Sequence, residues 1–191
     1  MMNICQISSR EIGTDDQIAL RRFVCCGRGA PSYTLDVQRY IRSLDLKNAI
    51  PGVYRMVLYC QGTSDIYGFC EFGYDDSLGP ESGYAISFIA VGLEYQRHGL
   101  GHMLLDCVLR WISNDAAISG RNPYVATQID AANAASIGLF SDMGFRDEGV
   151  DSYDPGYHMI PDITYGRERS LQWRVMIYGC FRPWCSRTVP S

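Results

Sequence analysis

The most informative part of the chain, residues 89–101, reads Ile-Ala-Val-Gly-Leu-Glu-Tyr-Gln-Arg-His-Gly-Leu-Gly. An apolar run at 84–91 leads into a turn and a glycine-containing loop, and a long helical pattern follows at 101–118. A helix N-terminus leaves several backbone N–H groups unpaired and carries partial positive charge, so it favours an anion. Gly99 and Gly101 remove side chains that would block a close approach, and Arg97 adds a formal charge. The stretch predicts a phosphate-binding loop between a strand and a helix.

Two common phosphate-binding motifs do not fit this loop. A P-loop requires Gly-x-x-x-x-Gly-Lys-Ser/Thr, whereas His102 follows Gly101 here. A dinucleotide fingerprint requires Gly-x-Gly-x-x-Gly and an acidic residue at the next strand, and the sequence lacks that pattern as well. A tight strand-to-helix turn also needs glycine for conformational reasons alone. That simpler explanation of the glycines stays open at this point.

The composition is that of an ordinary globular protein. The chain has 191 residues, of which 47% are hydrophobic, 12% aromatic and 20% charged. This length suits a single domain, 1–191, and the aromatic content argues against disorder. The 17 basic and 21 acidic residues give a net charge of -4. Such a balance disfavours a protein built to coat nucleic acid or an anionic membrane, so we expect neither as a partner.

The eight cysteines suggest neither a disulfide framework nor a metal site. Cys60, Cys70 and Cys107 each lie in an apolar run, where cysteine behaves as a small buried hydrophobe. The spacings lack the paired Cys-x2-Cys sets of a zinc site. The first ten residues do not resemble a signal peptide, and no stretch approaches the roughly 20 apolar residues of a membrane span. We expect a reduced, cytoplasmic protein without a bound metal.

Apolar periodicity and turn residues predict an alternating order of helices and strands. A short helix or strand is expected at 14–24, and helices at 34–44, 101–118 and 131–143. Strands are expected at 53–60, 66–74, 84–91, 124–129, 145–151 and 171–178, with a long loop at 151–170. A hairpin followed by strand–helix–strand–helix–strand indicates an α/β (α+β) sheet covered by helices.

Two motifs in this order resemble those of the GCN5-related N-acetyltransferase (GNAT) family. Residues 96–101, Gln-Arg-His-Gly-Leu-Gly, are similar to its Q/R-x-x-G-x-G/A signature, which lies between the fourth strand and the third helix. Residues 133–145, Asn-Ala-Ala-Ser-Ile-Gly-Leu-Phe-Ser-Asp-Met-Gly-Phe, resemble its N-x-x-A/S-x-x-L-Y-x-x-x-G-F segment. The resemblance is specific over 84–146. It implies one GNAT-type domain whose mixed central sheet has about six or seven strands flanked by helices.

The resemblance also implies a binding site for acetyl-CoA. The pyrophosphate would lie on the loop residues Arg97, His98, Gly99, Leu100, Gly101 and His102. The pantetheine arm would pair with the strand edge at Ile89, Ala90 and Val91, in a slot between this strand and 124–129. Asn133 would contact the arm, and Phe140 would form an apolar wall beside the thioester sulfur.

Two departures from the family pattern leave the general acid and base open. The family often has a tyrosine as proton donor for the departing thiolate, whereas this chain has Phe140 there. Members with a carboxylate base often carry it on the fourth strand, where residues 85–88 are Ala-Ile-Ser-Phe. The remaining candidate bases are Glu71, Asp130 and His98. Alternatively, Glu71 lies on the solvent face of a hairpin, Asp130 caps a helix, and His98 is a solvated loop residue.

The expected activity is transfer of an acetyl group from acetyl-CoA to a primary amine of a small molecule or peptide, by direct attack on the thioester. Two other functions stay open. One is a catalytically idle acyl-CoA-binding or sensor module. The other is a toxin-like acetyltransferase that acts on aminoacyl-tRNA, which the net charge disfavours because tRNA binding depends on phosphate neutralisation. The sequence identifies neither the acceptor nor the oligomeric state. A homodimer is one of the alternatives that stay open.

Overall fold

The computed structural model describes residues 7–76, 82–150 and 173–178. The chain divides into two compact units, Met1–Val125 and Ala126–Ser191. The elements of the first unit are β1 (Ile7–Glu11), η1 (Thr14–Asp16), α1 (Gln17–Arg22), α2 (Ser32–Ser43), β2 (Val53–Cys60), β3 (Ile66–Asp75), β4 (Gly83–Val91), η3 (Leu93–Tyr95) and α3 (Leu100–Ser119). β5 (Val125–Asp130) begins at the boundary, and α4 (Ala134–Asp142), β6 (Arg146–Val150) and β7 (Trp173–Tyr178) follow in the second unit.

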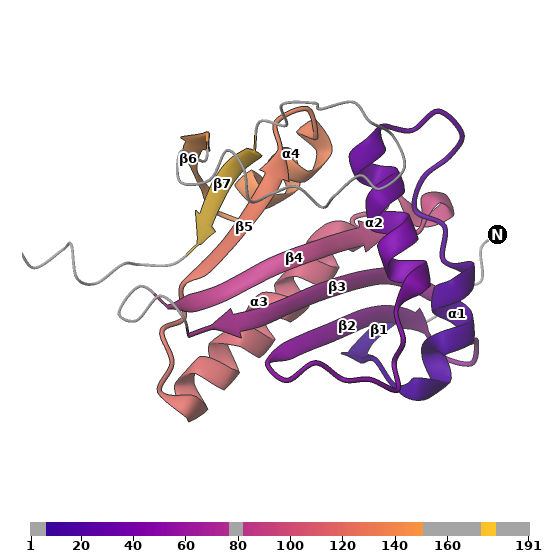
Figure 1. The fold of residues 1–191 in the computed structure, drawn as a ribbon, viewed down its shortest axis with the longest axis horizontal. Coiled ribbons are helices and arrows are strands. Elements are labelled where there is room, and N and C mark those ends of the chain that lie inside the picture. Colours follow the sequence, from indigo (N-terminus) through magenta and orange to yellow (C-terminus); the bar gives the residue numbers. More distant parts are fainter. Residues whose placement is uncertain (1–6, 77–81, 151–172, 179–191) are drawn as a thin grey trace, which may run out of the picture. The chain divides into compact units, whose positions relative to one another are not determined.

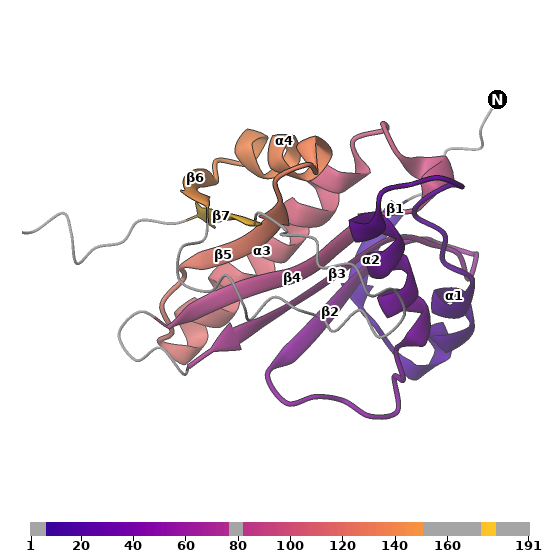
Figure 2. The same cartoon turned by 45° about the horizontal axis from the view of Figure 1, so that its top comes forward.

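The first unit is an antiparallel sheet in the order β1-β2-β3-β4. Helices α1 and α2 cover one face of this sheet and α3 covers the other (Figure 1, Figure 2). We refer to these as the α2 face and the α3 face. Since strand side chains alternate between faces, each strand contributes to both layers.

Apolar side chains fill both layers. On the α2 face, Leu20 and Ile41 pack with Val57 and Phe69 of the sheet, and all four are fully buried. On the α3 face, the helix lies close above β3 because Gly68 has no side chain. A Cβ there would approach the Leu104 side chain to 3.1 Å.

The second unit contains the strand order β5-β7-β6 and helix α4. β6 and β7 are antiparallel, with Arg146 paired to Ile177. Helix α4 ends before Gly144, whose φ of 87° is the left-handed conformation that its sequence position predicts. The ring of Phe145 then packs at 4.8 Å against Phe140.

The predicted fold class is confirmed: the protein is a mixed α+β structure whose strands are flanked by helices. Most predicted elements lie within a few residues of their observed bounds, and the range 14–24 contains the short helices η1 and α1. The expected loop at 151–170 lies outside the described residues. The expectation of a single domain over 1–191 stays a prediction.

Three expectations need correction. Strand β1 was not predicted, because its residues, Ile-Ser-Ser-Arg-Glu, show no apolar alternation. Helix α4 begins at Ala134 and not at residue 131, because Asn133 is its N-cap: the Asn133 side chain accepts a hydrogen bond from the Ser136 N–H at 3.2 Å. Cys60 is buried as expected, but it is disulfide-bonded. Cys25, Cys26, Cys70 and Cys107 are free, as expected.

Candidate active site

The loop between β4 and α3 has an unusual backbone. Arg97 has a φ of 64° and Gly99 a φ of 77°, so two of three consecutive residues are left-handed. This conformation is rare for a residue with a side chain, and Arg97 is the one non-glycine residue with positive φ in the described part of the chain. Turns that contain left-handed residues form concave backbone sites for anions. The local geometry therefore fits the phosphate-binding loop that the sequence predicts.

The helix that follows presents its N-terminus to the same place. Gly99 is the N-cap of the 20-residue helix α3 and supplies no side-chain cap, and the first turn of α3 has no acidic residue. The residues from Gln96 to Gly99 are all exposed. The partial positive charge of this helix end is therefore accessible to an anionic group such as a pyrophosphate.

The side chain of Gln96 connects this loop to its surroundings. Its amide nitrogen donates two hydrogen bonds, to the carbonyl of Val91 at 3.0 Å and to that of Cys25 at 2.7 Å. Nearby, the Leu93 N–H donates to the carbonyl of Val24 at 2.8 Å. The loop is thus joined both to the end of β4 and to the segment between α1 and α2. Sequence reasoning used Gln96 only as part of the signature and missed these contacts.

Glu71, a candidate base, lies on the α2 face and is 5% exposed, so it does not lie on a solvent face of the hairpin. Its carboxylate accepts a hydrogen bond from Arg55 Nε at 2.6 Å and from the Tyr40 hydroxyl at 2.7 Å to each oxygen. Burial and the hydrogen bond to Glu71 raise the pKa of Tyr40 to about 12. The Tyr40 ring stacks on Phe88 with centroids 4.1 Å apart. The carboxylate is thus an ion-paired acceptor in a buried cluster.

Sequence reasoning missed Arg55 and Tyr40 as partners of Glu71. One signal was present, since Arg55 and Glu71 are directly opposite each other in the ladder between β2 and β3. The strand bounds of the predicted hairpin imply that register, and opposite charges across a ladder attract. No comparable signal connects Tyr40, which comes from helix α2, to this pair.

An irregularity in β4 lies beside the cluster. Glu71 pairs with Phe88 but the next residue, Phe72, pairs with Ile86, so Ser87 is an extra residue in the ladder. Such a bulge re-aims side chains and leaves backbone groups outside the ladder. It occurs in the strand whose end, at Ile89, Ala90 and Val91, is the predicted edge for the pantetheine arm.

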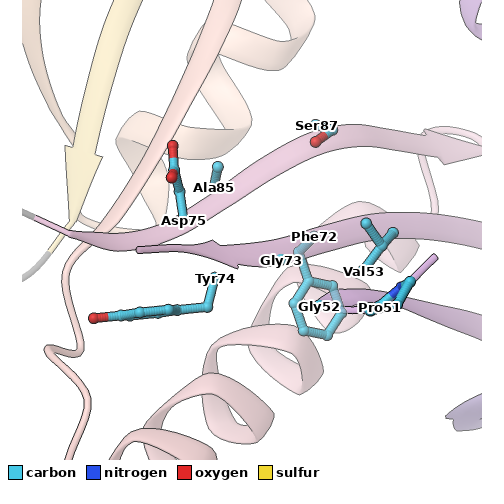
Figure 3. A pocket seen from close by; sticks show the side chains of 9 residues that line it. All are labelled: Pro51, Gly52, Val53, Phe72, Gly73, Tyr74, Asp75, Ala85 and Ser87. Carbon is cyan, nitrogen blue, oxygen red and sulfur yellow. The ribbon is translucent and has the colours of Figure 1, made fainter. Parts of the chain in front are cut away.

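A hollow of about 190 Å³ opens next to the bulge. Figure 3 shows Asp75 and Ala85 pointing to one side of the sheet and Phe72 and Tyr74 to the other, where α3 lies. The hollow is lined by Pro51, Gly52, Val53, Phe72, Gly73, Tyr74, Asp75, Ala85 and Ser87. Asp75 is the charged residue in this lining, so the hollow suits a cationic group better than an anionic one.

The other predicted site residues belong to the second unit. Asp130 ends β5, and its Oδ1 accepts a hydrogen bond from the Ala132 N–H at 2.8 Å, so it stabilises a turn before the helix and is not the helix cap. Asn133 is the cap, and its amide nitrogen also donates to Ser136 Oγ at 2.9 Å. Phe140 is 1% exposed and packs inside the unit. The slot predicted between β4 and β5, and the roles of these residues in it, stay predictions.

Two further properties concern other classes of site. The described residues contain no group of three or more His, Cys, Asp or Glu arranged to hold a metal ion. Among the same residues, no helix combines the length and apolar character that crossing a bilayer requires.

Comparison with known proteins identifies the family of the chain. Residues 29–145 match the acetyltransferase (GNAT) family, and the chain belongs to this family. No curated protein sequence matches the chain at a significant level.

Solved structures show the same fold. A GNAT-family protein from Desulfovibrio desulfuricans is 18% identical with a TM-score of 0.63, and the match covers 91% of this chain and 98% of that one. Arabidopsis thaliana NAA60 in complex with acetyl-CoA is 16% identical with a TM-score of 0.59, over 91% and 98% of the two chains. A spermidine N-acetyltransferase SpeG chimera from Vibrio cholerae and hSSAT is 14% identical with a TM-score of 0.60, over 90% and 94%. At these identities the likeness concerns the fold alone.

Proposed function

We propose that this protein transfers an acetyl group from acetyl-CoA to a primary amine of a small molecule or peptide, by direct attack of the amine on the thioester. The observation that carries the proposal is the exposed, left-handed turn from Arg97 to Gly99 at the N-terminus of α3. Within a GNAT-family chain, this turn supports binding of the pyrophosphate of the cosubstrate. Acetyl-CoA supplies the activated acyl group. The chain's own residues bind and orient the two substrates.

The cofactor-binding residues of this proposal are those that the family resemblance implies. Backbone N–H groups from Arg97 to His102 receive the pyrophosphate, and Ile89, Ala90 and Val91 offer a strand edge to the pantetheine arm. Asn133 and Phe140 contribute from α4. Because Phe140 has no acidic proton, water or another side chain protonates the departing thiolate. A thiol with a pKa near 8.5 is a tolerable leaving group at neutral pH, so this requirement slows the reaction without preventing it.

Two of the three candidate bases, Glu71 and Asp130, differ in how firmly hydrogen bonds hold them. Glu71 has both carboxylate oxygens engaged in a buried cluster, so it would have to break an ion pair to accept a proton. Asp130 is only partly buried and holds one turn N–H. We therefore propose Asp130 as the better base and assign Glu71 to orienting Tyr40 on the α2 face. The acceptor approaches over the hollow that Asp75 lines, which favours acceptors with a positive charge.

Calorimetry with acetyl-CoA tests the cofactor site directly. Gly99→Asp places a side chain and a negative charge where the pyrophosphate lies, and we expect affinity to fall at least about tenfold, or 1.4 kcal/mol. Gly62→Asp is the matched control, because Gly62 also has positive φ and nothing within 4 Å of its would-be Cβ, but it lies in the β2–β3 turn. If Gly99→Asp folds and binds acetyl-CoA as the wild type does, the site assignment is wrong.

Turnover is tested by release of CoA thiol with pooled small amines, polyamines and peptide N-termini. Release supports the acetyltransferase; binding without release for any amine supports the idle binding module. In an active protein, Phe140→Tyr raises kcat if nothing replaces the usual tyrosine, and leaves it unchanged if another group already donates the proton. A steep loss of activity with salt would instead support an RNA acceptor.

A further inference from the structure

The side chain of Gln96 makes a bridge between three parts of the first unit. A primary amide has two N–H hydrogens, and Gln96 uses both, one toward Val91 at the end of β4 and one toward Cys25. Val91 and Cys25 belong to elements far apart in the sequence. Gln96 itself immediately precedes the left-handed Arg97, so any change at Gln96 is transmitted to that residue through one peptide bond.

The segment that Gln96 reaches, residues 23–26, is itself held in place. The side-chain oxygen of Gln38, on helix α2, accepts hydrogen bonds from the N–H groups of Cys25 at 2.9 Å and Cys26 at 3.3 Å. The segment also accepts the hydrogen bond from Leu93 at the carbonyl of Val24. It is thus fastened to α2 on one side and to the loop on the other.

This bridge matters because the turn it adjoins is strained. A non-glycine residue at φ 64° has an energetic cost and persists only where its surroundings hold it. Gln96, Arg97 and His98 are exposed, so packing does not supply that restraint. The two hydrogen bonds from the Gln96 side chain, one part-buried and one exposed, fasten the loop directly before the turn. Further back in the loop, the Leu93–Val24 hydrogen bond and the stacking of Tyr95 on Tyr67 at 3.9 Å add to this restraint.

We infer that Gln96 is a positioning residue for the cofactor loop: its side-chain amide ties the loop to β4 and to residues 23–26, and so holds the turn from Arg97 to Gly99 in its anion-binding shape. Gln38 acts indirectly, because it forms hydrogen bonds with the same segment, residues 23–26, to which the Gln96 side chain is hydrogen-bonded. Helix α2 and the loop at the start of α3 are therefore energetically coupled through residues 23–26. The binding part of this inference rests on the proposed acetyl-CoA site, whereas the restraint on the loop does not.

Gln96→Met removes both donors and keeps the length of the side chain. Gln17→Met is the matched control, because Gln17 likewise uses its amide twice on the backbone of a distant segment, donating to the Leu44 carbonyl at 2.8 Å and accepting from the Leu46 N–H at 2.9 Å. Gln96→Arg restores N–H donors at the original position. A merely structural role predicts that Gln96→Met and Gln17→Met behave alike.

The first measurement is hydrogen exchange in the protein without ligand. Gln96→Met should speed exchange of the backbone amides at 97–103 at least about tenfold, a readout of local opening. Gln17→Met should leave these amides unchanged and act near residues 44–46. If the amides at 97–103 exchange equally in wild type and Gln96→Met, the inference is overturned, whether or not the protein binds acetyl-CoA.

The second measurement is the dissociation constant for acetyl-CoA. Gln96→Met should raise it about tenfold, Gln17→Met should leave it unchanged, and Gln96→Arg should restore it to within about threefold of wild type. Gln38→Met should raise it about threefold, and the double variant Gln38→Met/Gln96→Met should match Gln96→Met alone, because both act through one segment. If the wild type does not bind acetyl-CoA while the exchange difference persists, the proposed function fails and the bridge stands. Equal dissociation constants for wild type and Gln96→Met would contradict the positioning role.

Discussion

Each face of the antiparallel sheet carries a cluster of one arginine, one tyrosine and one carboxylate, and the two clusters have different surroundings. On the α2 face, Arg55 and Tyr40 both donate to Glu71, and the side chains of the ion pair are each 7% exposed. On the α3 face, Arg121 and Tyr84 both donate to Asp115, at 3.0 and 2.5 Å, but the ion-pair side chains are 36% and 24% exposed.

We expect burial, more than composition, to set how much such a cluster contributes to stability. Water solvates a charge at the partly exposed site if its partner is lost. At the buried site nothing replaces a lost partner, so removing one residue leaves the other charge unpaired in a medium of low dielectric constant. We therefore expect the α2-face cluster to tolerate substitution poorly, and the α3-face cluster to tolerate it well. Further ion pairs of graded exposure extend the comparison.

The largest expected effect is at the carboxylates. Glu71→Gln leaves Arg55 buried without a counter-charge and should lower the free energy of unfolding by about 3 kcal/mol or more. Asp115→Asn, the same change on the α3 face, should have less than a third of that effect. Urea denaturation of both variants measures the ratio, and equal losses would show that burial does not distinguish the two clusters.

The next effect comes from the two phenols, because a Phe substitution keeps the ring and deletes one donor. Tyr40→Phe should cost about 2 kcal/mol, since Glu71 loses a donor in a buried site, whereas Tyr84→Phe should cost about 1 kcal/mol because Asp115 retains access to water. Thermal unfolding reports both. A larger loss for Tyr84→Phe would reverse the ranking of the two faces.

A third ion pair tests the comparison through pH. Asp16 accepts two hydrogen bonds from Arg10, at 2.6 and 2.7 Å, and the side chains are 8% and 40% exposed. The hydrogen bonds from Arg10 lower the pKa of Asp16 below its ordinary value of 3.8.

The pKa of Asp16 is lower in the folded state than in the unfolded state. The stabilisation that its charged form provides is therefore complete above about pH 4 and is lost as the pH falls through the folded-state pKa. Asp16→Asn should therefore cost about 1 kcal/mol near pH 6, and the deficit should shrink toward pH 2. Urea denaturation at several pH values checks this. A deficit that stays constant over that range would mean that the charge of Asp16 is not its source.

The smallest effect belongs to the most exposed of these ion pairs, which lies on α3. Arg110 Nε lies 2.9 Å from Asp106 Oδ2, one helical turn away, with side chains 79% and 47% exposed. Asp106→Asn should change the free energy of unfolding by no more than about 0.5 kcal/mol, and added salt should erase the difference. A loss as large as that at Asp16 would indicate that exposure is a poor guide to the strength of these pairs.

Local signals in the sequence determined most of the secondary structure and the position of the turn before α3. Apolar periodicity marked β2, β3 and β4, because alternation and continuous apolar runs reflect burial of each segment's own residues. Gly144 marked one of the left-handed positions, since this conformation depends mainly on the residue itself. The two family motifs lie in these same segments, so the class of protein was also readable.

Only the tertiary structure decided which distant residues meet. β1 forms because it pairs with β2 in an antiparallel ladder, and its own polar residues do not predict this pairing. Tyr40 completes the Glu71 cluster from a helix 31 residues away, and Gln96 reaches Cys25 across 71 residues. Such contacts depend on how separate elements pack, and side-chain hydrogen bonds leave no periodic trace in the sequence. For the same reason, the sequence proposed Glu71 as a base, and only the structure placed it in a buried ion pair.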